Sequence, residues 1–270
     1  MSKQKNDPRS AGPIAWRTIF VICVTLASAA LMPRAQAQSD GAAKILKTMS
    51  DYVAGQKSVS LTYDADIEVI TPDLQKIQFA SSGQVQLSRP DKLRASRTGG
   101  YSDIELVFDG KTLTVNNKDG NSFAQLDLPG STDQLIETLR EKHAIAAPGA
   151  DLLLSSVFDT MTADVVNAKH IGVGVVDGVE CEHLAFRNLE TDWQIWIETG
   201  ARPLPRKYVI TSKSVAGAPQ YTLRIKEWRS DVPADAFAFK PAPGAKNVAL
   251  EALADIDELP HANLAAGDKK

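Results

Sequence analysis

Residues 60–88, SLTYDADIEVITPDLQKIQFASSGQVQLS, alternate apolar and polar side chains with a period of two. The apolar residues that share one side of the first half are Leu61, Tyr63, Ala65, Ile67 and Val69. Those of the second half are Ile77, Phe79, Val85 and Leu87. This alternation is typical of antiparallel strands with one face in water. Because Thr71-Pro72-Asp73 supplies a turn between the halves, the stretch predicts a hairpin with one apolar face.

Similar segments recur along the chain and predict a mostly antiparallel sheet. They are DKLRASR, IELVFDG, KTLTVNN and SFAQLDL before residue 130, then VVNAKHIGVGVV, CEHLAFRNLETDWQIWIE, PRKYVITSK, YTLRIKEW and a final strand AFAFKPAPG. Asp109-Gly110, Asp119-Gly120 and Asp177-Gly178 stand where hairpin turns are expected.

Three segments have helical spacing instead. The first begins at a cap on Ser39 or Asp40, and its apolar residues are Ala42, Ile45, Leu46, Met49, Tyr52 and Val53. Ser131 opens STDQLIETLREKHAI, and Pro148-Gly149 ends that helix before DLLLSSVFDTM begins another. This last helix is apolar nearly all round, so it is either a deeply buried helix or a movable lid over a ligand. A curled sheet must cover its apolar face, and the two central helices are suited to do so.

The N-terminal residues read as a secretory signal peptide. A basic start precedes the apolar run TIFVICVTLASAALM, and Ala35-Gln36-Ala37 provides a small-x-small cleavage site. The apolar run is shorter than the roughly 20 residues of a spanning helix, although an uncleaved anchor stays an alternative. We therefore predict a cleaved signal at 1–37, one domain at 38–250, a flexible tail at 251–270, and export to the periplasm.

Cleavage would remove five basic residues and one acidic residue, which changes the formal net charge from −3 to −7. A mildly acidic surface disfavours nucleic acid as a partner. Cys181 would then be the only cysteine, which excludes an intrachain disulfide.

The segment CEHLAFRNLETDWQIWIE, residues 181–198, gathers a thiol, an imidazole and two tryptophans. Cys181 and His183 share a strand face, but two ligands make no structural zinc site, so no metal is expected. An enzyme site on Cys181, His183 and Asp192 is the weak alternative, and the sequence holds no phosphate loop, nucleotide fingerprint or nucleophile elbow that would call for a cofactor or catalysis. Trp193 shares a face with Ile195 and Ile197 and is expected on the core side, whereas Trp196 is expected on the outer side.

Four motifs, in order, resemble the LolA-like lipoprotein-carrier superfamily. They are Gly83 to Arg94 (GQVQLSRPDKLR), Phe108 to Leu113 (FDGKTL), Leu204 to Lys207 (LPRK) and Phe237 to Gly244 (FAFKPAPG). The segment VECEHLAFRNLETDWQIWIETGARPLPRKYVIT is similar to an uncharacterised branch of predicted periplasmic proteins in that superfamily. The resemblance implies an α+β fold: a strongly curved antiparallel half-barrel sheet covered by the N-terminal helix and two central helices. It also implies a cavity for the acyl chains of lipids or lipoproteins, whose burial gains roughly 0.8 kcal/mol per methylene.

We accordingly expect a carrier or binding protein for a hydrophobic ligand, without covalent chemistry or a cofactor, and with peripheral or transient membrane contact. The residues expected to line its cavity are Tyr63, Ile67, Phe79, Val85, Leu106, Phe108, Leu139, Leu153, Phe158, Met161 and Trp193. The alternative is an interaction or sensor module that fills its own core and binds an envelope protein.

Overall fold

The computed structural model describes residues 32–143, 145 and 147–253. The basic start and apolar run of the expected signal peptide, and most of the expected tail, lie outside these residues. The first helix, α2 (Met32–Ala54), begins before the expected cap at Ser39 or Asp40 and runs through Ala35-Gln36-Ala37. Alanine and glutamine are good helix formers, so nothing in this part of the uncut chain stops the helix.

The strands of the described residues form one sheet, in which all neighbours are antiparallel except β12 and β6. Its order is β12-β6-β5-β4-β3-β2-β1-β11-β10-β9-β8-β7. The strands before the central helices are β1 (Ser58–Ile70), β2 (Lys76–Ser88), β3 (Lys92–Gly99), β4 (Asp103–Phe108), β5 (Thr112–Asn117) and β6 (Ser122–Asp127). Those after them are β7 (Asn167–Val176), β8 (Val179–Arg187), β9 (Thr191–Glu198), β10 (Pro205–Ser212), β11 (Gln220–Arg229) and β12 (Lys246–Asn247).

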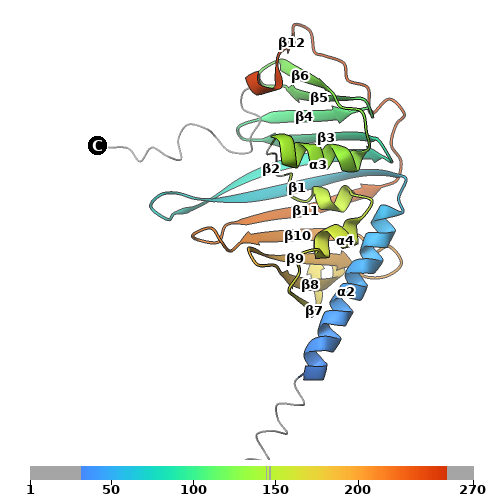
Figure 1. Cartoon of the computed structure of the whole chain (residues 1–270), viewed down its shortest axis with the longest axis vertical. Coiled ribbons are helices and arrows are strands. Elements are labelled where there is room, and N and C mark those ends of the chain that lie inside the picture. The colour runs from blue at the N-terminus through green and yellow to red at the C-terminus, as the bar shows by residue number, and fades with distance from the viewer. Residues whose placement is uncertain (1–31, 144, 146, 254–270) are drawn as a thin grey trace, which may run out of the picture.

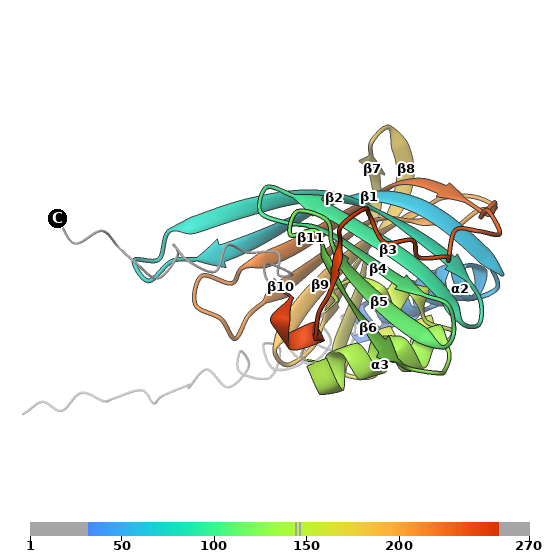
Figure 2. The same ribbon diagram turned by 90° about the horizontal axis from the view of Figure 1, so that it is seen from above.

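The helices lie together on the concave face of this sheet. Figure 1 shows α3 (Thr132–His143) across the β3–β4 half, α4 (Val157–Thr162) across β9–β11, and α2 along the β7 end. Figure 2 shows the strands arching above all three helices. The expected half-barrel covered by three helices is therefore confirmed.

Local sequence signals place the central helices. Ser131 and Gln134 form a capping box at α3, because the Ser131 N–H donates to Gln134 Oε1 at 2.8 Å and the Gln134 N–H donates to Ser131 Oγ at 3.3 Å. The helix expected over residues 151–161 is divided into the 3₁₀ turn η1 (Ala150–Leu153) and the short helix α4, with Ser155 and Ser156 between them. Serine side chains compete for backbone hydrogen bonds, which favours a break there.

The turn between β7 and β8 follows the expected chemistry. At the β7–β8 turn, Asp177 and Gly178 have φ values of 49° and 82°, the left-handed pair of a type I′ turn. The β1–β2 hairpin pairs along its whole length, with Tyr63 opposite Gly83 and Ile67 opposite Phe79. The predicted pairing of these two strands is thus confirmed.

The predicted final strand at AFAFKPAPG was wrong. Residues 236–244 run as turns and extended chain, and β12 follows them. Pro241 and Pro243 lack the N–H groups that a ladder needs. Residues 236–244 instead pack against the outer face of the sheet. Arg94 Nη1 donates to the Ala236 carbonyl at 2.8 Å, and the ring of Phe239 lies 5.1 Å from that of Phe123.

Candidate functional site

The concave face of the sheet and the helices form one continuous apolar core. The helical residues in it come from every part of the cover: Ala42, Leu46, Met49, Val53, Leu135, Leu139, Leu152, Val157 and Met161. They meet the inward-facing residues of the strands, among which Phe108, Leu113 and Ile195 are fully buried. The sheet and its helical cover therefore touch through apolar side chains.

Of the eleven residues expected to line a cavity, nine belong to this core or pack against it, and two lie at a separate pocket. Val85, Phe108, Leu139, Met161 and Trp193 lie within this core, and Tyr63, Leu106, Leu153 and Phe158 pack against it. Ile67 and Phe79 lie farther along the same face of β1 and β2, where they line a pocket. The seven sheet residues share the concave face, and the helices supply the other four.

We call α3, η1 and α4 the lid, and polar contacts tie its parts to one another. Arg140 of α3 donates to Asp151 of η1 at 2.8 Å, and Asp133 of α3 accepts from the Ser155 N–H at 3.2 Å. One hydrogen bond joins the lid to the β2–β3 turn, because the N–H of Thr132 at the start of α3 donates to the Pro90 carbonyl at 2.8 Å. Gly149, at φ +84°, brings the chain onto the sheet so closely that a Cβ there would lie 2.9 Å from Leu223 Cδ2. The lid is thus braced internally and lies closely on the apolar face.

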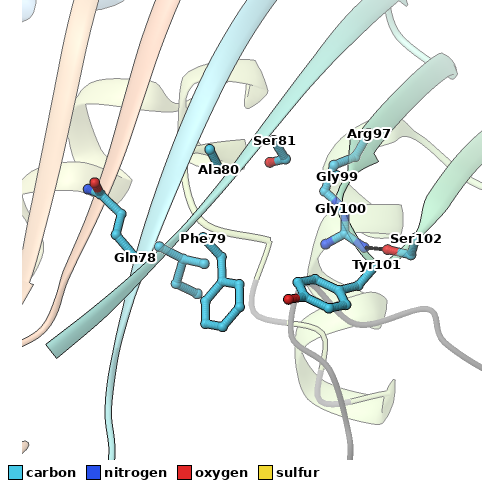
Figure 3. Close-up of a pocket in the computed structure, with 10 residues that line it drawn as sticks. Gln78, Phe79, Ala80, Ser81, Arg97, Gly99, Gly100, Tyr101 and Ser102 are labelled. Carbon is cyan, nitrogen blue, oxygen red and sulfur yellow. Dashed lines mark hydrogen bonds between the residues drawn. The ribbon is translucent and has the colours of Figure 1, made fainter. Parts of the chain in front are cut away.

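A pocket of about 160 Å³ lies beyond the covered core. It is lined by the C-terminal part of β1, the N-terminal part of β2, the C-terminal part of β3 and the β3–β4 loop. Ile67, Phe79, Ser81, Arg97, Tyr101 and Ser102 are among its lining residues. Figure 3 shows the rings of Phe79 and Tyr101 side by side with the Arg97 guanidinium next to them; the two rings meet edge to face at 5.6 Å. Arg97 Nη2 donates to Ser102 Oγ at 3.0 Å.

Arg97 was missed by the sequence reasoning, although a signal was present. In DKLRASR the alternation puts Leu93, Ala95 and Arg97 on one side, and the structure places that side against the core. Its charge acts on two tyrosines of the concave face: burial raises the pKa of Tyr63 and of Tyr221, and the Arg97 charge opposes this rise in both. A cation therefore lies at the edge of the apolar face.

Tyr63 and Gly83 form a close contact between the covered core and this pocket. The Tyr63 hydroxyl donates to the Ser96 carbonyl at 3.2 Å across β2. A Cβ on Gly83 would lie 2.5 Å from the Tyr63 hydroxyl oxygen and closer still to the ring and to the Ser96 carbonyl. The ring of Tyr63 therefore packs directly over Gly83, the first residue of the Gly83–Arg94 motif.

Residues 181–198 form a wall of the sheet with two differently used faces. On the concave face, the Trp193 ring stacks on Phe186 at 3.9 Å and meets Tyr208 edge to face. On the outer face, Trp196 stacks on His183 at 4.1 Å and lies 4.9 Å from Lys207 Nζ. The expected opposite placement of the two tryptophans is confirmed.

The groups of the alternative enzyme site each have other partners. Burial raises the pKa of the Cys181 thiol, which donates to the Val179 carbonyl at 3.4 Å. His183 Nε2 lies 2.9 Å from Gln194 Oε1. The Arg187 guanidinium and Lys213 lower the pKa of Asp192 to about 2. No group of three or more potential metal ligands occurs in the described part of the chain.

Residues 42–251 match the family described as "Predicted periplasmic protein (DUF2092)". No curated protein matches the sequence. Within the described ranges, no helix is both long and apolar enough to span a bilayer.

Several solved structures are similar in fold. Lipoprotein LppX from Mycobacterium tuberculosis is 15% identical with a TM-score of 0.46, over 73% of this chain and 99% of its own. LprF from Mycobacterium bovis is 13% identical with a TM-score of 0.47, over 73% and 96%. The LolA superfamily protein NE2245 from Nitrosomonas europaea is 13% identical with a TM-score of 0.32, over 73% and 97%.

Proposed function

This chain belongs to the DUF2092 family of predicted periplasmic proteins, and we propose that it is a periplasmic carrier or binding protein for a hydrophobic ligand such as an acyl chain. The observation that carries the proposal is the contact between lid and sheet. Apolar side chains make most of this contact. One backbone hydrogen bond, from Thr132 to Pro90, joins the lid to the β2–β3 turn, whereas the contacts of Arg140 and Asp133 join parts of the lid to one another. A lid of this kind can leave the sheet as a unit, because few directional bonds to the sheet must break.

The energies of lid and ligand are of similar size. Burial of Leu135, Leu139, Leu152, Val157 and Met161 contributes on the order of 10 kcal/mol, taking about 2 kcal/mol for each side chain. An acyl chain with about 14 methylenes gains roughly 11 kcal/mol when it is buried on the same surface. Exchange of lid side chains for an acyl chain is therefore close to balanced, which suits uptake and release. The ligand is held without covalent chemistry.

The test is native mass spectrometry of the full chain, exported through its own N-terminus and purified without detergent. We expect an acyl species bound to the protein, either co-purified or after addition of palmitate. Phe158→Asp on α4 should abolish the adduct, because Phe158 packs against the core beneath Lys47. Thr160→Asp, on the exposed side of the same helix, is the matched control and should retain it.

A second candidate rests on the completeness of the core. Because Phe108 and Leu113 of the sheet and Leu135 of the lid are almost fully buried, the protein could fill its own concave face permanently and act as an interaction module for an envelope protein. In that case the wild type would show only its bare mass, and added palmitate would produce no adduct. That result would overturn the carrier proposal.

A further inference from the structure

The β1–β2 hairpin projects beyond the rest of the sheet, and its tip is apolar. Figure 1 and Figure 2 show this hairpin extending farther than the neighbouring strands. Leu74 at the tip is 70% exposed, and Val215 in the adjacent β10–β11 turn is 48% exposed. The two turns are in contact, because a Cβ on Gly217 would lie 2.8 Å from Ile70 Cδ1. Apolar side chains from two turns therefore lie at the most prominent point of this end of the sheet.

Hydrogen bonds hold the hairpin tip in one conformation. The N–H of Thr71 donates to the Gln75 carbonyl at 2.9 Å, and the N–H of Gln75 donates to Thr71 Oγ1 at 3.0 Å. The N–H of Leu74 donates to the Thr71 carbonyl at 2.9 Å. Leu74 has a φ of +67°, a left-handed conformation that bulky residues rarely adopt and that glycine and asparagine adopt easily. The turn itself therefore does not favour leucine, and its exposed side chain is explained by a contact outside the chain.

An apolar path leads from the tip to the covered core. On the concave face of the hairpin, Val69 is paired with Ile77, and Ile67 is paired with Phe79. We call these two pairs the hairpin track, and all four side chains are partly exposed. The next residue inward on the same face of β1 is Ala65, which belongs to the core. Because successive residues on one strand face are about 6.6 Å apart, an acyl chain can pass from tip to core on an apolar surface.

The size and charge of the tip fit the surface of a bilayer. Residues 69–77 contain one acidic residue, Asp73, and one basic residue, Lys76, which pairs with Glu68 at 2.9 Å. The tip therefore has no charge excess that would attract a charged partner. A stable protein–protein interface usually involves about 20–30 residues a side, which is more than two turns supply. At a bilayer surface, in contrast, binding scales with the apolar area that is buried.

From these observations we propose that the tip of the β1–β2 hairpin inserts transiently into the surface of a phospholipid bilayer, and that the ligand passes between bilayer and core along the hairpin track. The inference rests on the proposed function for the identity of the ligand. It adds the partner surface at which the protein takes up or releases that ligand.

Insertion is tested with phosphatidylcholine vesicles and the exported protein. Leu74→Cys, labelled with an environment-sensitive fluorophore, should show a blue shift of emission when vesicles are added. Val175→Cys with the same label is the matched control and should show no shift, because Val175 is also 70% exposed but lies beside the β7–β8 turn, away from the tip. Cys181 is fully buried and should not take the label. The shift should persist in high salt, since apolar burial produces it.

Transfer of palmitate from the vesicles to the protein tests the route. Leu74→Asn should slow this transfer at least tenfold, because burial of a leucine side chain is worth about one to two powers of ten. The Kd for palmitate added in solution should stay unchanged. The thermal midpoint of Leu74→Asn should equal or exceed that of the wild type, because asparagine accepts the left-handed conformation. Leu74→Met, which keeps an apolar side chain, should retain fast transfer.

The outcomes separate this inference from the function beneath it. If the label at residue 74 shows no shift, or if Leu74→Asn transfers palmitate as fast as the wild type, tip insertion is refuted and the carrier stands. A shift that occurs only with anionic vesicles and is lost in high salt would also refute apolar insertion. A dimer that depends on Leu74, without vesicle binding, would assign the tip to a contact between two copies and overturn the proposal. Insertion by a protein that binds no palmitate would support the membrane contact and overturn the carrier.

Discussion

Replacing Gly83 with alanine tests the close contact between β2 and Tyr63. The new Cβ would lie 2.5 Å from the Tyr63 hydroxyl oxygen and closer still to the ring and to the backbone carbonyl of Ser96. The ring has to move or β3 has to separate from β2. Since the Ser96 oxygen is a backbone atom in a paired strand, it cannot rotate away as a side chain would.

The expected loss can be worked out from three contributions. Overpacking costs about 1–3 kcal/mol, and loss of the hydrogen bond from Tyr63 to Ser96 costs about 1 kcal/mol. The lower backbone entropy of alanine in the unfolded chain returns about 0.4–1 kcal/mol. We therefore expect Gly83→Ala to lower the free energy of unfolding by about 1–3.6 kcal/mol.

Urea unfolding followed by tryptophan fluorescence measures this loss. Gly100→Ala is the control, because no atom lies within 4 Å of its added Cβ, and its effect should stay within about 0.5 kcal/mol. In a Tyr63→Ala background the cost of Gly83→Ala should fall by about 1 kcal/mol or more, leaving the part due to Ser96. An unchanged cost in that background, or a single-variant loss below about 0.5 kcal/mol, would refute the packing argument.

Three further predictions concern the lid, the alkaline limit of stability and the buried thiol. Arg140→Gln should lower the free energy of unfolding by less than about 1 kcal/mol, because the ion pair of Arg140 with Asp151 is partly exposed. Amide hydrogen exchange should nevertheless become faster in η1 and stay unchanged in β9. An exchange rate in η1 equal to that of the wild type would contradict the role of this ion pair in holding the lid together. The free energy of unfolding should fall as the pH rises above about 9–10. Burial raises the pKa of Tyr208 and Tyr221 above the ordinary value of 10.0 and that of Cys181 above 9.0. At high pH the unfolded chain therefore releases protons that the folded chain retains. Tyr208→Phe should reduce this alkaline loss between pH 8 and pH 10.5 in urea titrations, and a loss of the same size in that variant would exclude Tyr208 as a source. Cys181 is fully buried and should react with a thiol reagent only upon unfolding; a fast reaction in the native protein would show that the β7–β8 hairpin opens locally.

The strands and their inward faces could be predicted well because alternation is a local property. In β1 and β2 the expected apolar side is the side that meets the core. Asp177-Gly178 and the Ser131–Gln134 capping box likewise depend on neighbouring residues. The predicted strand at residues 236–244 failed because its prolines prevent strand pairing, while the Phe239 ring packs on that of Phe123 at the outer face of the sheet.

The candidate site could be predicted only in part. Periodicity identified apolar residues on the concave face, such as Phe108 and Trp193, but it assigns a side of a strand and not a depth beneath the lid. Ile67 and Phe79 were expected in the same cavity as Met161, and the structure places them instead at the open-end pocket. The pocket itself also needs Tyr101 and Ser102 from a loop, whose residues have no period to follow.

The sequence alone therefore determined the antiparallel strands, their turns, the apolar face and the family resemblance, because each depends on residue type at short spacing. Only the tertiary structure decided that Arg140 and Asp151 join two parts of the lid, and that Arg97 lines the same pocket as the Phe79–Tyr101 pair. These features join residues of different elements, and the curvature of the sheet sets the distances between them. Curvature is a property of the whole sheet, so no single segment of the chain encodes it.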